Sequence, residues 1–145
     1  GAVAAVPLIW DAEGNPSVVL VRQYRPPLDE LVLEIPAGMR DVPGEPTEVT
    51  AARELVEEVG LEAGTIRRRR DFHPPSVLYL SLATDLRAVE RSTPGPEEAP
   101  SEGVHLPLGI AVDMVLRGEI RDAKTIVGLL LVERELRSSG AWGGA

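Results

Sequence analysis

The chain has 145 residues, of which 43% are hydrophobic, which suffices for one domain with a buried core. It contains no cysteine, so disulfides and thiolate metal sites are excluded, and a bound metal would need oxygen or histidine ligands. The formal net charge of −8 disfavours nucleic acid as a partner, and no apolar run reaches the roughly 18 residues of a membrane-spanning helix, so no membrane partner is expected.

The first half of the chain predicts three strands, a loop and a helix. Residues 2–10 and 17–24 are apolar and rich in β-favouring residues, and the turn-forming residues between them predict a hairpin. Residues 31–35 predict a third, short strand that ends at a proline. A loop rich in Gly, Asp and Pro over 37–45 precedes the clearest helix, over 46–59, which a glycine terminates.

The second half predicts two strands followed by two helices. These elements are expected over residues 66–72, 77–84, 109–117 and 122–136. Asp122 is a plausible N-cap of the last helix, and residues 93–103, with three prolines and three glutamates, predict an exposed loop. We therefore expect a single α/β domain over residues 1–137, followed by a disordered tail over 138–145.

The helix over 46–59 carries a cluster of carboxylates. At about 100° per residue, Glu54, Glu57 and Glu58 fall on one face. The opposite face carries the apolar residues expected to anchor the helix, namely Val49, Ala52, Leu55, Val56 and Val59. Carboxylates at this spacing repel each other by about 0.2–0.5 kcal/mol per pair, and oxygen-only ligands favour Mg²⁺ or Mn²⁺ as the compensating ion. Taken alone, the three glutamates would also fit a solvated acidic surface.

The residues around this helix resemble the Nudix box. Gly38 is followed by a loop, then by Glu45, seven further residues and the sequence RELVEEVGL over residues 53–61. One more residue than usual separates Gly38 from Glu45, and this insertion falls in the loop and leaves the helix register intact. The resemblance implies a Nudix α/β/α sandwich, with a mixed sheet between helices.

The resemblance also implies roles for the box residues. The three glutamates of the helix would bind Mg²⁺, or Mn²⁺ in its place, together with the backbone carbonyl of Ala37. The glutamates and Arg53 form the expected catalytic set. Glu45 and Arg53 would brace the loop against the helix, and Gly38 and Gly60 are the glycines of the box.

The flanking sequences resemble the ADP-ribose pyrophosphatase branch of this family. They are VRQYRP over residues 21–26, LEIPAG over 33–38 and RGEIRDAKTI over 117–126. This resemblance implies a small-molecule nucleotide-sugar as the substrate and magnesium-assisted hydrolysis of ADP-ribose to AMP and ribose 5-phosphate. By family analogy it also implies a homodimer. The chain shows no signal peptide, so a cytoplasmic enzyme is expected, and we expect the native N-terminus to extend before Gly1.

Four residues of the flanking sequences are candidates for substrate binding. Arg25 would clamp a pyrophosphate oxygen through its guanidinium fork, with a surface ion pair as the alternative. Arg22 is a weaker candidate for the same role. Glu34 would reach the metal site or a ribose hydroxyl, unless it is a strand charge that faces solvent. Tyr24 would stack on adenine, although core packing is the preferred interpretation.

The chain departs from this branch after the turn that follows Phe72. The branch usually carries a glycine-rich loop there, which ends in a glutamate that serves as general base, but no glutamate occurs here between Glu62 and Glu90. One interpretation is that the loop is absent and that Glu57, Glu58 or the Glu97–Glu98 pair is the base. The other, which we favour, is that the chain as given lacks residues of this loop.

Two other functions compete with nucleotide-sugar hydrolysis. The same chemistry would serve a hydrolase of another nucleotide, such as a dinucleoside polyphosphate or an oxidised nucleotide. A non-catalytic Nudix module that senses a nucleotide belongs to a different functional class. The complete set of box carboxylates favours an enzyme over a sensor.

Overall fold

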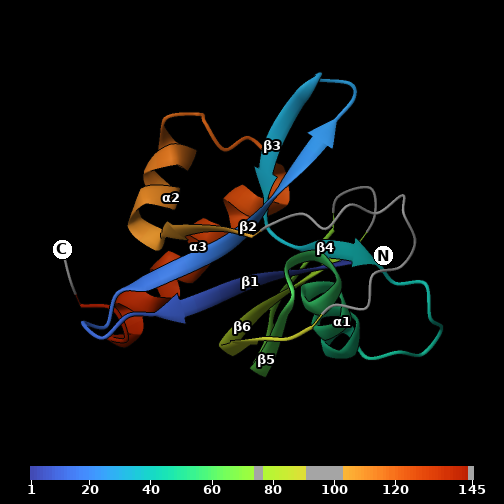
Figure 1. The fold of residues 1–145 in the computed structure, drawn as a ribbon, viewed down its shortest axis with the longest axis horizontal. Coiled ribbons are helices and arrows are strands. Elements are labelled where there is room, and N and C mark those ends of the chain that lie inside the picture. Colours follow the sequence, from blue (N-terminus) through green and yellow to red (C-terminus); the bar gives the residue numbers. More distant parts are fainter. Residues whose placement is uncertain (74–76, 91–102, 144–145) are drawn as a thin grey trace.

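The computed structural model describes residues 1–73, 77–90 and 103–143, and its strands and helices are labelled in Figure 1. The elements in chain order are β1 (Ala2–Trp10), β2 (Pro16–Arg25), β3 (Glu30–Glu34), β4 (Ala37–Met39), α1 (Thr47–Val59), β5 (Leu61–Phe72), β6 (Leu78–Ala88), β7 (Val104–Pro107), α2 (Leu108–Leu116) and α3 (Ala123–Ser139).

The strands form a mixed sheet in the order β3-β2-β1-β6-β5, with β4 paired to β1 and β7 paired to β2. β1 and β6 are parallel, and the other pairs are antiparallel. β1 holds the sheet together, because its first residues pair with β4 and β6 and its last residues pair with β2. The mixed sheet predicted from the sequence is confirmed.

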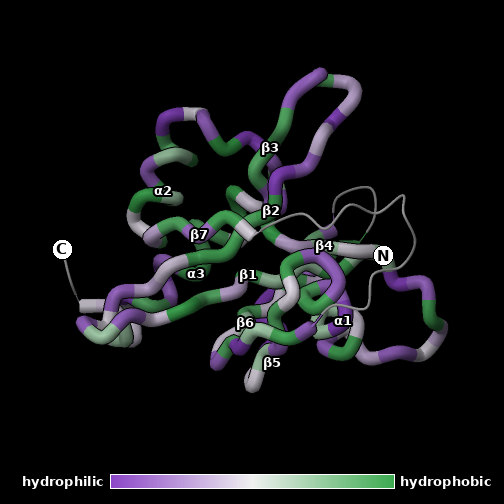
Figure 2. Tube along the Cα trace, viewed as in Figure 1, coloured by the Kyte–Doolittle hydropathy of each residue, from purple (hydrophilic) through white to green (hydrophobic). Residues whose placement is uncertain are grey.

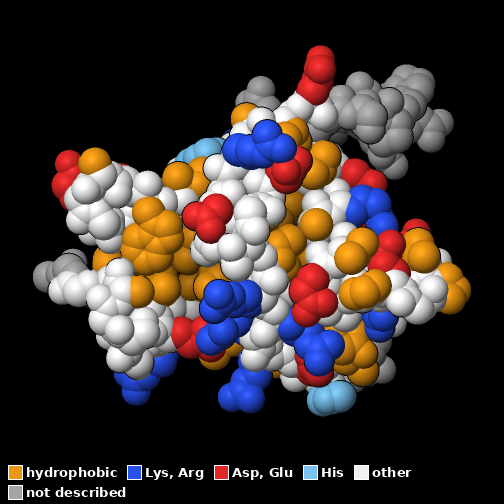
Figure 3. All heavy atoms as spheres, turned by 90° about the horizontal axis from the view of Figure 1, so that it is seen from below, with side chains coloured by type: hydrophobic (Ala, Val, Ile, Leu, Met, Phe, Trp, Pro, Cys, Tyr) orange, Lys and Arg blue, Asp and Glu red, His pale blue; other side chains and the backbone are white. Residues whose placement is uncertain are grey.

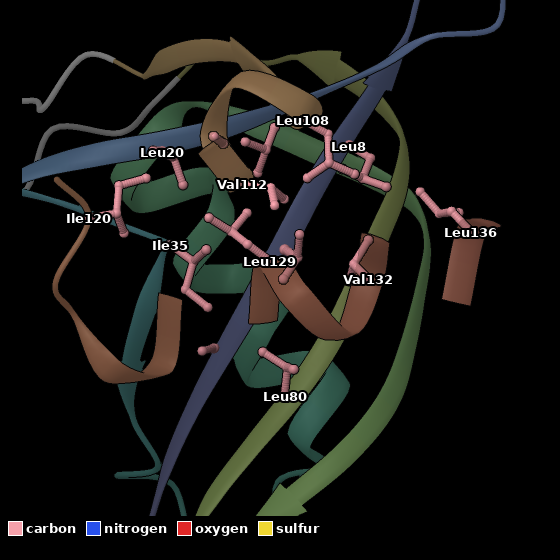
Figure 4. Packing of buried hydrophobic residues seen from close by; sticks show 14 of the residues in the cluster. Leu8, Leu20, Ile35, Leu80, Leu108, Val112, Ile120, Leu129, Val132 and Leu136 are labelled. Atoms are coloured by element: carbon pink, nitrogen blue, oxygen red, sulfur yellow. The ribbon is translucent and has the colours of Figure 1, made fainter. Parts of the chain in front are cut away.

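Helices cover both faces of this sheet. On one face Val3 and Ala5 pack with Leu55 of α1. The alternate residues of β1 point to the other face and pack with α2 and α3, where Leu129 and Val132 are fully buried. Figure 4 shows these two side chains directed from α3 toward the strands. The alternation of β1 therefore builds an α/β/α sandwich, as the sequence predicts.

The apolar residues concentrate where the layers meet. Figure 2 shows hydrophobic residues along β1, whereas the projecting end of the β2–β3 hairpin is largely hydrophilic. On the face shown in Figure 3, acidic and basic side chains are interspersed rather than separated by sign. None of the helices in the described ranges combines the length and apolarity needed to cross a bilayer.

The ends of the two main helices agree with their sequence signals. α1 ends at Gly60, whose φ of 66° places it in the left-handed region that glycine tolerates best. α3 begins at Asp122, whose carboxylate accepts from the backbone N–H of Thr125. The sequence did not predict the short strands β4 and β7, and β5 and β6 are longer than expected. The predicted loop over 93–103 lies, except for Gly103, outside the described residues.

The structure corrects the expected disordered tail. α3 continues to Ser139, and Trp142 beyond it is only 6% exposed. The Arg137 guanidinium lies 3.8 Å from the centre of the Trp142 ring, an arrangement that a cation–π contact stabilises. Because Trp142 packs back against the core that α2 and α3 share, residues 138–143 belong to the folded domain.

Candidate active site

The residues of the predicted box come together where β4 meets α1. A Cβ atom at Gly38 would lie only 2.1 Å from the carboxyl group of Glu54, so any larger residue at this position would displace that carboxyl group. One residue earlier, the backbone N–H of Ala37 donates to Oε2 of Glu58 over 3.2 Å. Two helix carboxylates thus lie against the backbone of β4.

Glu45 is the centre of a brace between the loop and α1. Its carboxylate accepts from Nη1 of Arg53 at 2.8 Å and from the hydroxyl of Thr50 at 2.6 Å. The hydrogen bond from Arg53 is the main reason that the pKa of Glu45 lies below its usual value. Arg40 adds a hydrogen bond to the backbone oxygen of Glu45 at 2.8 Å. These contacts fix the loop that precedes the helix, which is the role expected for Glu45 and Arg53.

The three glutamates of α1 do not share one environment. Glu58 is largely buried, and its burial together with the negative charge of Glu54 raises its pKa to about 7. The Glu57 side chain is 47% exposed, and its Oε1 lies 3.9 Å from Nε of Arg53. In the described ranges no three Asp, Glu or His side chains lie close enough to hold a metal ion. The structure therefore brings Glu54 and Glu58 together and leaves Glu57 at the rim.

The buried face of α1 also differs from the expected apolar ridge. The buried residues are Thr47, Thr50, Ala51 and Leu55, whereas Val49 is 50% exposed. Val49 was expected to anchor the helix, so this expectation is wrong. The helix is rotated so that its small and polar residues, together with Glu54 and Glu58, face the protein.

The pair formed by Glu54 and Glu58 fits a hard divalent cation. Their mutual repulsion contributes to the raised pKa of Glu58, and a cation between them would remove it. The oxygen ligands available at this position suit Mg²⁺ or Mn²⁺. Ala37 places backbone atoms next to Glu58, so its carbonyl is a further candidate ligand.

A second charged cluster joins β2, β3 and the start of α3. Glu34 is only 2% exposed, and it accepts from Nε and Nη2 of Arg25 at 2.6 and 2.5 Å. Nζ of Lys124 donates to the same carboxylate at 2.7 Å and to Asp122 at 3.0 Å. Burial alone would raise the pKa of Glu34, but the hydrogen bonds from Arg25 and Lys124 outweigh it and keep the pKa below its usual value. The alternative in which Glu34 faces solvent is therefore wrong.

The two clusters are close enough to influence each other. The negative charge of Glu58 is among the causes that raise the pKa of Arg25, after its contact with Glu34. The positive charge of Lys124 opposes the rise in the pKa of Glu58. Arg25 and Lys124 thus both lie within electrostatic range of Glu58. Lys124 was not among the predicted site residues, although it lies in the segment 117–126 that carried the family resemblance.

Cavities lie on both sides of the start of α3. One, of about 340 Å³, is lined by Arg25, Glu34 and Arg121 together with apolar residues of the β2–β3 hairpin. The other, of about 380 Å³, is mainly apolar and is lined by Phe72, Leu78, Val127 and Lys124 among others. The charged cluster stands between them, an arrangement suited to an elongated ligand with an anionic centre.

The remaining predicted residues lie further out. Tyr24 is 54% exposed and its hydroxyl donates to Asp29 at 2.6 Å, so the interpretation as a core residue is wrong. Arg22 is exposed on β2. Glu97 and Glu98, two of the candidate bases, lie outside the described residues, as does the turn over 74–76.

The sequence of this chain is similar to those of known proteins. Residues 1–105 match the model of the NUDIX domain family. The chain is 44% identical to an ADP-ribose pyrophosphatase of Mycobacterium tuberculosis over 91% of its own length and 64% of that protein, and so spans slightly less than two thirds of this relative. It is 34% identical to an ADP-ribose pyrophosphatase of Bacillus subtilis, over 86% of this chain and 68% of that one.

Two further similarities concern a different substrate and a solved structure. The chain is 32% identical to a GDP-mannose pyrophosphatase of Salmonella typhimurium, over 77% of this chain and 63% of that protein. The crystal structure of an ADP compounds hydrolase superposes with a TM-score of 0.82 at 28% identity, and the match covers 97% of this chain and 75% of that one.

Proposed function

The chain belongs to the NUDIX domain family, and on that basis we propose that it hydrolyses the pyrophosphate bond of a nucleoside diphosphate-sugar. ADP-ribose is the proposed substrate, and AMP and ribose 5-phosphate are the proposed products. The similarity to two ADP-ribose pyrophosphatases supports this choice, as does the similarity to an ADP compounds hydrolase.

One observation carries the proposal: Arg25 lies within electrostatic reach of Glu58, whose pKa is raised by burial and by Glu54. Metal-assisted hydrolysis of a diphosphate can use both of these features, an acidic pair to hold a cation and an arginine to hold the phosphates. Cavities on both sides of the start of α3 offer room for the two ends of the substrate.

Divalent metal use is a general property of this family, and Mg²⁺ is the ion we propose, with Mn²⁺ as a substitute. Glu54, Glu58 and the carbonyl of Ala37 would hold it, and Glu57 at the rim is the remaining candidate. When bound, the ion would neutralise the diphosphate and activate a water for in-line attack.

Arg25 would bind the substrate with only part of its guanidinium. Nε and Nη2 donate to Glu34, so Nη1 and the second N–H of Nη2 are directed elsewhere. Glu34 thereby acts through Arg25, because it orients the guanidinium and is itself almost completely buried. A phosphoryl oxygen would take the N–H groups that Glu34 leaves.

The test is a comparison of substrates with the purified protein and Mg²⁺. We expect ADP-ribose to give AMP and ribose 5-phosphate with a higher kcat/KM than GDP-mannose, a dinucleoside polyphosphate or an oxidised nucleotide. GDP-mannose is the second candidate, because relatives 32% identical to this chain are GDP-mannose pyrophosphatases. Tight nucleotide binding without any turnover would instead indicate a sensing module and would refute hydrolysis.

Two substitutions connect turnover to the glutamates of α1. We expect Glu58→Gln and Glu57→Gln each to reduce kcat/KM by at least about 100-fold, the usual effect of removing a charged group that stabilises the transition state. Glu62→Gln is the matched control, because Glu62 is exposed on β5 and pairs with Arg87. Rates near those of the unmodified protein for the first two variants would contradict the assigned roles.

By family analogy we also propose a homodimer and a cytoplasmic location. Light scattering on the purified protein measures its mass in solution, and a monomer at enzymatically active concentrations would contradict the first of these. Cell fractionation tests the second.

A further inference from the structure

Lys124 is the only lysine of the chain, and its position is unusual for an ammonium group. Its side chain is only 18% exposed, and it lies in the first turn of α3. Lysine is rarely buried to this extent without a specific partner, since burial removes most of the hydration of its charge. Figure 1 shows where α3 begins, close to β3, and the backbone N–H of Ile35, the residue after β3, donates to the hydroxyl of Thr125 in α3.

Both carboxylates that Lys124 contacts also have other partners. Glu34 already receives two hydrogen bonds from Arg25, one to each oxygen. Asp122 accepts from the backbone N–H and the hydroxyl of Thr125, at 3.2 and 2.6 Å, and it caps the positive end of α3. An arginine and a helix end therefore share the stabilisation of these two acids with Lys124, so Lys124 is not the sole partner of either.

One of the three N–H groups of Lys124 is not used by these two contacts. An ammonium group has three N–H bonds, and within the described ranges Nζ donates to Glu34 and Asp122. The side chain lines the apolar cavity of about 380 Å³, beside Phe72 and Leu78. A cation at the edge of an apolar cavity interacts strongly with an anion, because little water screens the pair.

The position of Lys124 relative to the acidic pair limits the kind of anion. Burial and the charge of Glu54 raise the pKa of Glu58, and Lys124 acts in the opposite direction, so it lies within electrostatic reach of the proposed metal ligands. Nη2 of Arg25 and Nζ of Lys124 both donate to Oε1 of Glu34, so the two cations lie close together. A diphosphate held beside Glu54 and Glu58 would therefore meet Arg25 and Lys124 together.

We propose that Lys124 is a second cation of the substrate site, which donates its remaining N–H to an oxygen of the substrate diphosphate. This proposal rests on the proposed function for the identity of the substrate. It assigns to Lys124 a contact with the substrate in addition to its place in the cluster at the start of α3.

The kinetic test uses Lys124→Met, which keeps the length of the side chain and removes its charge. We expect the KM for ADP-ribose to rise by about 10- to 100-fold, which is the value of a charge-assisted hydrogen bond, with little change in kcat. Lys124→Arg keeps the charge and should recover most of the loss. The control is Arg117→Met, which removes a positive charge from an exposed pair with Glu119 in the same segment and should leave KM unchanged.

A second measurement observes the contact directly. In protein labelled with ¹³C-lysine, Lys124 gives the only side-chain lysine signal, so its Cε resonance is assigned without mutation. We expect this resonance to shift when methylenediphosphonate, a diphosphate that cannot be hydrolysed, is added with Mg²⁺. No corresponding shift is expected with an equal concentration of sulfate.

Two results would overturn the proposal. One is a Lys124→Met variant that keeps its KM and loses kcat and melting temperature together, because that pattern indicates a structural role alone. The other is a Cε resonance that stays fixed at saturating methylenediphosphonate. If the unmodified protein fails to hydrolyse ADP-ribose, the proposed function is refuted, and the resonance still decides whether Lys124 binds a diphosphate.

Discussion

Replacing Glu58 by glutamine removes a carboxylate whose charged form destabilises the folded protein. The amide has almost the same size as the carboxyl group, and its oxygen can still accept the hydrogen bond from the backbone N–H of Ala37. The substitution therefore changes the electrostatics of the site with little change in packing. Its effect on stability should depend strongly on pH when no metal is added.

The magnitude follows from the pKa of Glu58, which rises from 4.5 to about 7 on folding. Because the pKa is higher in the folded chain, the protonated form favours the folded state below about pH 4.5, and this contribution is lost as the pH rises through about 7. At about 1.4 kcal/mol for each pH unit, the loss reaches at most about 3 kcal/mol. For a domain of this size, that corresponds to roughly 10 °C in Tm.

The assay is thermal unfolding of both proteins from pH 4 to pH 8 in the presence of a chelator. We expect the unmodified protein to lose stability relative to Glu58→Gln as the pH rises, and the variant to be the more stable of the two at pH 8. Added Mg²⁺ should then stabilise the unmodified protein at pH 8 more than the variant, because binding favours the folded state. A constant difference between the two Tm curves across this range would refute the electrostatic argument.

Three further predictions follow from the packing around the site. Gly38→Ala should lower kcat/KM for ADP-ribose while Tm changes little, because the added Cβ displaces only the mobile end of Glu54; a variant with full activity would contradict the close approach. Arg25→Met should raise the KM for ADP-ribose by about 10-fold or more. It should also lower the free energy of unfolding, because Glu34 then keeps only one of its two cationic partners. Equal KM values for the variant and the unmodified protein would exclude Arg25 from substrate binding. Trp142→Ala should lower the free energy of unfolding, measured by urea titration, by about 3 kcal/mol, which is the usual cost of deleting a buried tryptophan side chain. An unchanged free energy of unfolding would mean that residues beyond α3 do not stabilise the fold.

The sequence predicts those features whose physical cause is local. The end of α1 at Gly60 and the start of α3 at Asp122 follow from single residues that favour a left-handed turn and an N-cap. The apolar, β-favouring residues of β1 likewise predict a strand by themselves, and they pack on both faces of the sheet. These signals need no knowledge of what lies elsewhere in the chain.

The features that the sequence did not predict depend on contacts between residues that are far apart in the chain. Pairing with β1 turns residues 37–39 from an expected loop into β4, and local composition does not show this pairing. Glu34 is buried because Arg25 and Lys124 supply cations from β2 and α3, and Lys124 lies 90 residues away in sequence. Trp142 is ordered because it packs on a core that α2 and α3 share, although the residues around it are small and polar.

The rotation of α1 shows how a functional site changes the packing of the helix that carries it. Glu54 and Glu58 are four residues apart, so they lie only about 40° apart around the helix, whereas Glu57 lies about 60° from Glu54 in the opposite sense. A helix that turns Glu54 toward Gly38 and Glu58 toward Ala37 must therefore leave Glu57 at the edge. The same rotation exposes Val49, and threonine and alanine fill the buried face because small side chains let the helix approach β4. The orientation of this helix thus combines the burial of Leu55 with the placement of two acids against β4, and Val49 is left exposed.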